Sequence, residues 1–195
     1  WQRKGGNSTN NKSGKNKANP QLVAKGWSNI LEEVDWLQGW VKAGYCWTAT
    51  HFLDRHRKSE NACGSNLVVI DFDGDTTLER FWACPTAQQW CALTYTSSSH
   101  TDSEHRFRAL FPLETELKSS AQHRGAYWLI VNRLLQELQL AELKDNCGQK
   151  PERLWYGNTR AVFKRNGDAC VPAFLLDAVS YTHLTLPTRY RVEVA

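Results

Sequence analysis

Hydrophobic and polar residues recur along the chain with periods that predict both helices and strands. In 28–44, apolar positions return every three or four residues, which predicts an amphipathic helix capped by Ser28. A second and longer amphipathic helix is expected over 119–140. The segment 76–84 carries a capping-box pattern at its start and is followed by proline, so it predicts a short helix.

Other segments have the short apolar or alternating pattern of strands. The segment 66–72 is rich in Val and Ile, which predicts a short strand buried on both faces, after a polar loop that runs through Ser65. Helices and strands are mixed without regular alternation, so the pattern favours an α+β fold. The expected strands are 45–52, 66–72, 92–96, 105–112, 154–156 and 161–164.

The two ends of the chain differ in composition from its middle. Residues 1–20 are mostly Asn, Lys, Gly and Ser and predict a flexible basic linker. Residues 179–195 include a stretch that resembles a translated transposon-end adapter from sequencing libraries, so we expect the natural sequence to end near 178. The chain also contains no methionine, which predicts a fragment whose informative part is a truncated core at 21–178.

The net charge of +4 belongs to these ends. Residues 1–20 carry five basic and no acidic residues, and 179–195 carry two basic and one acidic residue. The part between 21 and 178 is left with 17 basic and 19 acidic residues, a balance of −2. Global charge is therefore no argument for nucleic-acid binding by the core, and only a local basic cluster could provide it.

Two broad classes are disfavoured by the sequence. No apolar run approaches the roughly 20 residues of a membrane-spanning helix, and the start has no signal-peptide pattern. The six cysteines form no CxxC pair, and the six histidines form no ligand set with them. We therefore expect a cytoplasmic protein with reduced thiols and no membrane partner.

Candidate chemistry begins at the end of the aliphatic strand. Asp71 and Asp73 lie two positions apart, so in a strand their carboxylates project from the same face. Two adjacent carboxylates repel each other unless a cation lies between them, and oxygen ligands suit Mg²⁺ or Mn²⁺. The alternative is a pair of solvated acids in the turn that continues through Gly74 and Asp75.

Candidate anion-binding groups follow the next strand. The loop after 92–96 contains Ser98 and His100, which can donate hydrogen bonds to phosphate oxygens. In the strand 105–112, Arg106 and Arg108 share one face, and the residues between them face the core. This pattern suits a triphosphate or a nucleic-acid backbone, although two arginines on an exposed strand face remain the simpler alternative.

Together these motifs resemble, in order, those of the archaeo-eukaryotic primase superfamily, especially the primase-polymerases of plasmids, phages and mobile elements. Asp71 and Asp73 resemble the first motif of paired metal-binding acids. Ser98-Ser99-His100 resembles the Ser-x-His motif that contacts the phosphates of the incoming nucleotide. The third acidic motif is best matched by Asp145, with Asp168 and Asp177 as rivals for that role.

The segment after Asp145 adds to this resemblance. Arg153-Leu154-Trp155-Tyr156-Gly157-Asn158 is similar to the superfamily's Arg-aromatic-Tyr-Gly segment. The resemblance spans roughly residues 25–165 and implies an RRM-like sheet with packed helices. Arg153, Tyr156 and Asn158 would then lie at the nucleotide site.

The resemblance implies a DNA primase or polymerase that adds nucleotides to a primer by a two-metal mechanism. Asp71, Asp73 and Asp145 would hold Mg²⁺ or Mn²⁺ as catalytic residues, and Ser98, His100, Arg106 and Arg108 would hold an NTP or dNTP. The partners would be a DNA template and primer, and a helicase domain in a part of the protein beyond this chain.

Two other functions compete with this one. Asp71-Phe72-Asp73-Gly74 also resembles the DxDG motif of haloacid-dehalogenase-type phosphatases, in which Asp71 would be the nucleophile. The residue after Gly74 is Asp75 where that family has Thr, and no later pair of acids supplies its fourth motif. The third possibility is a replication-initiator domain that uses the primase fold without catalysis.

Overall fold

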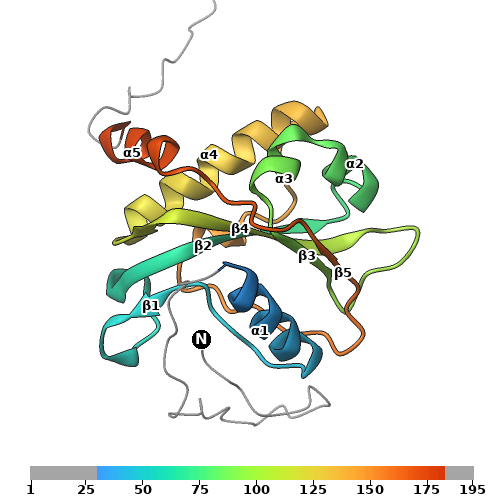
Figure 1. Cartoon of the computed structure of the whole chain (residues 1–195), viewed down its shortest axis with the longest axis horizontal. Helices are drawn as coiled ribbons and strands as arrows, with labels where there is room; N and C mark the ends of the chain where they lie inside the picture. The colour runs from blue at the N-terminus through green and yellow to red at the C-terminus, as the bar shows by residue number, and fades with distance from the viewer. Residues whose placement is uncertain (1–29, 183–195) are drawn as a thin grey trace, which may run out of the picture.

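A computed structural model describes residues 30–182 as one mixed sheet-and-helix domain. Its centre is a five-stranded antiparallel sheet with the strand order β1-β2-β4-β3-β5 (Figure 1). The strands are β1 (His51–Phe52), β2 (Ala62–Asp73), β3 (Leu93–Thr96), β4 (Arg106–Leu117) and β5 (Phe163–Arg165). The helices are α1 (Ile30–Lys42), α2 (Leu78–Ala83), α3 (Pro85–Trp90), α4 (Ser120–Leu138) and α5 (Ala173–Thr182). The α+β class expected from the sequence is confirmed.

Both faces of the sheet are covered. Figure 1 shows α2, α3, α4 and α5 on one face and α1 on the other. On the four-helix face, Phe72 and Phe107 stack with ring centroids 4.8 Å apart, and both are fully buried. The α1 face buries a second cluster that includes Leu67, Val69 and Leu110. Residues 67–70 are therefore buried on both sides, as the run of aliphatic residues predicted.

The helices predicted over 28–44 and 119–140 are close to the observed α1 and α4. The side chain of Ser119 caps α4 by accepting a hydrogen bond from the Gln122 backbone N–H. The helix ends two residues before the expected Leu140, because Gln139 takes the left-handed conformation, with φ at 58°. In α2 the capping side chain is that of Thr77, one residue after the expected one.

Several strand predictions were wrong in extent. The expected strand 45–52 is reduced to β1 and one isolated bridge between Trp47 and Trp155, and the expected strand 154–156 to the other half of that bridge. Conversely, β2 begins at Ala62, inside the expected polar loop, because β1 and the end of β4 pair with its first residues. Tertiary pairing rather than local composition decided these boundaries.

The predictions for the two ends of the chain concern residues at or beyond the limits of the described range 30–182. The linker 1–20, the predicted cap Ser28 and the residues from 183 onward lie outside the described residues. Helix α5 runs through Thr182 and so crosses the expected boundary at 178. Within 30–182, none of the helices has both the length and the apolar character needed to cross a membrane.

Candidate metal centre

The sheet register brings the acids of β2 against the arginines of β4. Asp71 lies opposite Arg108, and Asp73 lies opposite Arg106. Directly opposed residues of an antiparallel pair project from the same face, so all four side chains lie on the α1 side of the sheet. The alternation predicted for Arg106 and Arg108 is confirmed, since Phe107 between them is fully buried on the other face.

A third acid reaches this place from a distant part of the chain. The short 3₁₀ helix Cys147–Gln149 packs against β2, and a Cβ added at Gly148 would collide with the Val69 carbonyl and lie 2.7 Å from Cε2 of Tyr127. This close approach fixes the residues just before Gly148. As a result Asp71, Asp145 and Cys147 each offer one ligand atom, and these atoms all lie within 4.8 Å of one another.

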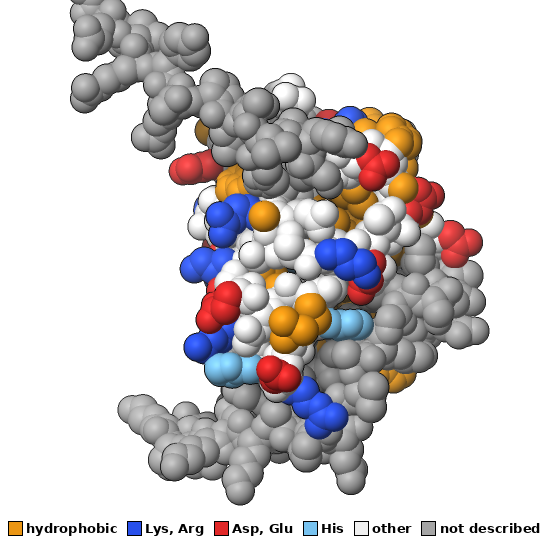
Figure 2. All heavy atoms as spheres, turned by 90° about the vertical axis from the view of Figure 1, so that its left-hand side faces the viewer, with side chains coloured by type: hydrophobic (Ala, Val, Ile, Leu, Met, Phe, Trp, Pro, Cys, Tyr) orange, Lys and Arg blue, Asp and Glu red, His pale blue; other side chains and the backbone are white. Residues whose placement is uncertain are grey.

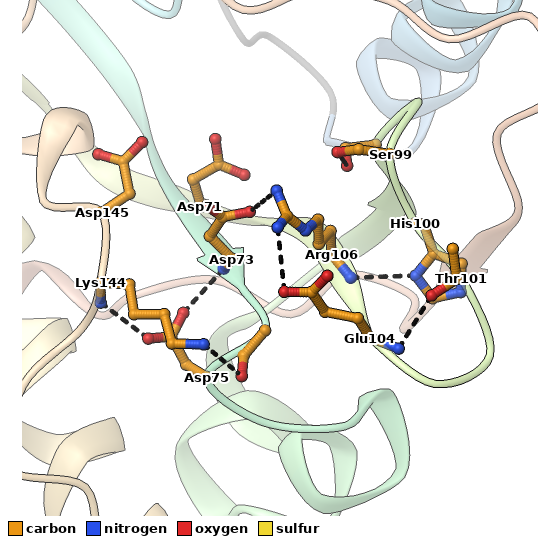
Figure 3. Close-up of polar contacts among 12 residues, drawn as sticks. Asp71, Asp73, Asp75, Ser99, His100, Thr101, Glu104, Arg106, Lys144 and Asp145 are labelled. Atoms are coloured by element: carbon orange, nitrogen blue, oxygen red, sulfur yellow. Dashed lines mark hydrogen bonds and ion pairs between the residues drawn. The ribbon is translucent and has the colours of Figure 1, made fainter.

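A carboxylate clamp holds the two segments together. Asp75 accepts a hydrogen bond from the Asp73 backbone N–H at 2.8 Å and another from the Lys144 backbone N–H at 2.8 Å. The Lys144 ammonium also donates to the Gly74 carbonyl at 3.1 Å. Figure 3 shows these bonds tying the end of β2 to the segment that carries Asp145. Asp75 therefore positions Asp145 beside Asp71.

Asp73 has a different partner from the one that the sequence predicted. Its carboxylate lies 2.7 Å from Nη1 of Arg106, whose Nη2 donates to Glu104 at 3.0 Å (Figure 3). The structure thus brings together two of the three expected metal ligands, Asp71 and Asp145. Asp73 lies beside them but is neutralised by Arg106.

Arg108 is held more deeply than Arg106. Its side chain is 11% exposed, and it donates to the Tyr156 carbonyl at 2.6 Å and to the Tyr95 hydroxyl at 3.3 Å. Its Nε lies 3.6 Å from the Asp71 carboxylate. Burial opposes the charge, but Tyr95 and Asp71 outweigh it and raise the pKa of Arg108. A permanent positive charge is therefore fixed beside the acid pair.

The electrostatic environment of Asp71 and Asp145 favours a bound cation. Burial raises the pKa of Asp71, and repulsion from Asp145 adds to this effect, while Arg108 opposes it. The Asp71 side chain is 13% exposed. Burial also raises the pKa of the Cys147 thiol to about 12, with a hydrogen bond to Asp145 as the next cause. A divalent cation would relieve the carboxylate repulsion, and Asp71 and Asp145 offer the oxygen ligands that Mg²⁺ and Mn²⁺ prefer.

The Ser/His loop forms the hairpin between β3 and β4. His100 accepts a hydrogen bond from the Arg106 backbone N–H through Nδ1, at 3.1 Å. Ser98 is exposed at the hairpin, where the hydroxyls of Ser97 and Ser99 lie 3.2 Å apart. Figure 3 shows Arg106 between the acids and this hairpin. The structure therefore brings His100 to the edge of the site through Arg106, and Ser98 lies further out.

The segment 153–158 closes the other side. Arg153 reaches Asp145 with 3.9 Å between its Nη2 and the carboxylate. Asn158 donates to the Thr96 carbonyl at 3.1 Å, so it anchors the segment to β3. Tyr156 is 54% exposed, while its carbonyl accepts a hydrogen bond from Arg108. Arg153 thus lies at the acid group, Tyr156 is available to a ligand, and Asn158 has a structural role.

The rival acids lie elsewhere. Asp168 stands near Cys170 in the segment between β5 and α5, and Asp177 is on α5, which packs against α4. Among the described residues, the group of possible metal ligands that includes Asp71 contains neither of them. Asp145 is the acid that the fold brings to Asp71.

Three residues of the site were not found from the sequence. The sequence indicates Asp75 only as part of a turn and Cys147 only as one of six cysteines without a CxxC partner, and it assigns no role to Tyr127. The Tyr127 hydroxyl is buried without a hydrogen-bond partner, and burial followed by the nearby Cys147 and Asp145 raises its pKa. The two-residue spacing of Asp145 and Cys147 was the only available signal, and it has no meaning until the loop packs on β2.

One face of the molecule shows no concentration of positive charge among the described residues (Figure 2). Figure 2 shows one face of the molecule, on which the described basic and acidic side chains are interspersed. This agrees with the near balance of charges in 21–178. On this face a nucleic acid would find no basic stripe.

No protein-family model, curated protein or solved structure matches the chain. The family that the order of motifs resembles therefore stays a prediction.

Proposed function

We propose that the chain is the catalytic core of a template-dependent nucleotidyltransferase, a DNA primase or polymerase. The observation that carries the proposal is the meeting of Asp71 and Asp145, from distant segments, beside the fixed charge of Arg108. A carboxylate pair for a divalent cation next to guanidinium groups for phosphate is the arrangement that phosphoryl transfer requires.

The carboxylates and guanidiniums divide the work between them. Asp71 and Asp145 would hold Mg²⁺ or Mn²⁺, which when bound lowers the pKa of an attacking hydroxyl and neutralises the departing pyrophosphate. Arg106 at the outer side of the site is 30% exposed and can reach a triphosphate, with His100 supporting its backbone. Arg108 is too enclosed to move and supplies a fixed field.

The pair of Asp73 and Arg106 has a function in this scheme. An incoming triphosphate would compete for the Arg106 guanidinium, because phosphate oxygens accept its N–H groups as well as a carboxylate does. Arg106 would then turn from Asp73 to the phosphate. The released Asp73 would be free to join Asp71 as a metal ligand, so the nucleotide itself would complete the site.

The phosphatase alternative is weaker on two counts. Its second acid must reach the leaving group as a proton donor, but the Asp73 carboxylate is held in an ion pair with Arg106 at 2.7 Å. Its nucleophile must be reached by a phosphomonoester, but the Asp71 side chain is only 13% exposed. The non-catalytic initiator domain differs from the leading proposal only in lacking activity, so an assay separates them.

The test is primer extension on a DNA template with Mn²⁺ or Mg²⁺ and labelled dNTPs or NTPs, using the full chain. Wild type should extend the primer, and Asp71→Asn and Asp145→Asn should each reduce extension by at least about a hundredfold. Asp168→Asn, an exposed acid away from the site, is the matched control and should extend like wild type.

Three outcomes would overturn the proposal. The first is no incorporation by folded wild type, which leaves the initiator domain. The second is phosphate release from a phosphomonoester without incorporation, which favours the phosphatase. The third is extension that survives both substitutions.

A further inference from the structure

The group of possible metal ligands contains a sulfur atom as well as oxygens. Cys147 comes from the same turn as Asp145, and its backbone N–H donates to the Asp145 carboxylate at 2.7 Å. This bond holds the Asp145 carboxylate within the turn that carries Cys147. Mg²⁺ seldom accepts thiolate ligands, whereas Zn²⁺ and Co²⁺ bind sulfur and carboxylate oxygen together.

A second feature points into the same place. Tyr127 is fully buried, and its hydroxyl has no hydrogen-bond partner. Its ring lies against Gly148, the residue after Cys147. Burial raises the pKa of its hydroxyl, and the neighbouring Cys147, Asp145 and Asp71 add to this effect. A buried hydroxyl without a partner is costly. A metal-bound water or a ligand oxygen would satisfy it.

We propose that Asp71, Asp145 and Cys147 form a mixed carboxylate–thiolate site that binds a thiophilic divalent cation, Zn²⁺ or Co²⁺, in preference to Mg²⁺. On binding, the S–H bond of Cys147 breaks, a metal–sulfur bond forms, and the proton leaves to solvent. The Tyr127 hydroxyl hydrogen-bonds to the water that completes the coordination.

The site shares Asp71 and Asp145 with the proposed nucleotidyl transfer, but the inference does not depend on that activity. A metal held through Cys147 would occupy the place of the catalytic cation, so Zn²⁺ would compete with Mg²⁺ for the same carboxylates. Binding is measured without nucleotide or DNA, so a failure of the activity and a failure of this site are distinguishable.

The probe is Co²⁺ added to the chain after reduction with a phosphine, because a cobalt–thiolate bond gives a charge-transfer band in the near ultraviolet. Wild type should show this band with one equivalent of Co²⁺. Zn²⁺ should abolish it by displacement, while about a hundredfold excess of Mg²⁺ should leave it in place.

Cys147→Ser should lose the band and bind Zn²⁺ at least about tenfold more weakly. Cys170→Ser is the matched control, because that thiol also lies near two acids, Glu114 and Asp168, yet is outside the group. It should keep the band. Asp145→Asn keeps the thiol but removes one oxygen, and should weaken Co²⁺ binding with the band still visible at saturation.

Circular dichroism of each variant shows whether it is folded. Absence of the band in wild type would overturn the proposal. Persistence of the band in folded Cys147→Ser, or its loss at equal concentrations of Mg²⁺ and Co²⁺, would do so as well. If Cys147→Ser is unfolded, the Asp145→Asn variant decides. A Co²⁺ affinity of Asp145→Asn equal to that of wild type would also overturn the proposal.

Discussion

Asp75 offers the sharpest test of how this site is assembled. Its two carboxylate oxygens accept the backbone N–H groups of Asp73 and Lys144, each at 2.8 Å. In Asp75→Ala both donors lose their partner. In Asp75→Asn the side chain keeps its shape, but one oxygen becomes an NH₂ group, which would face a backbone N–H. The Asn variant therefore removes one of the two bonds without opening a cavity.

The size of the effect follows from these contacts. Hydrogen bonds to charged acceptors contribute about 1.5–3 kcal/mol each when protected from water. The bond from Asp73 is partly buried and the bond from Lys144 is exposed, so we expect about 2 kcal/mol for Asp75→Ala and about 1 kcal/mol for Asp75→Asn. With a urea slope of about 2 kcal/mol per molar, these values correspond to midpoint shifts of about 1 M and 0.5 M.

The loss of Asp75 should weaken metal binding as well as lower the stability of the fold. Asp75 holds the segment that carries Asp145, so its loss should weaken Mn²⁺ or Co²⁺ binding by about tenfold to a hundredfold, as for other groups that orient metal ligands. The assay is urea unfolding followed by Trp fluorescence, with metal titration of the folded variants. Asp102→Asn, an exposed acid in the β3–β4 hairpin, is the control. Metal affinities of Asp75→Ala and wild type that agree within twofold would refute the clamp.

Two further predictions concern the packing that supports the site. Gly148→Ala should destabilise the fold by about 1–3 kcal/mol, because the new methyl group would meet the Val69 carbonyl and the Tyr127 ring; unchanged urea unfolding would contradict this close approach. His123 is 3% exposed and donates through Nε2 to the Gly148 carbonyl, and burial lowers its pKa below the ordinary value of 6.5. Since only the unfolded chain takes up this proton readily, its contribution to stability is complete above pH 6.5 and is lost as the pH falls toward the folded pKa. His123→Gln should flatten that part of the stability profile, and an equally steep profile in the variant would exclude His123 as its source.

The local pattern of residues determined the main helices and strands and which side chains share a face. The aliphatic run before Asp71 predicts a buried strand, and the alternation of side chains in a strand puts Asp71 and Asp73 on one face. The same alternation places Arg106 and Arg108 together, and the apolar face of α4 follows from its helical spacing. Such predictions succeed because strand and helix periods are set by neighbouring residues in the chain.

The tertiary structure decided which of these groups meet. The pairing of β2 with β4 set Arg106 opposite Asp73, so the guanidinium pairs with the carboxylate that the sequence predicted as a second metal ligand. The packing of Gly148 on the edge of β2 brought Asp145 to Asp71 and added Cys147. Contacts between distant segments depend on how whole surfaces pack, so the spacing of residues within one segment does not predict them. For this reason the sequence alone indicated acids that could bind a cation, and only the fold showed that a thiol lies among them.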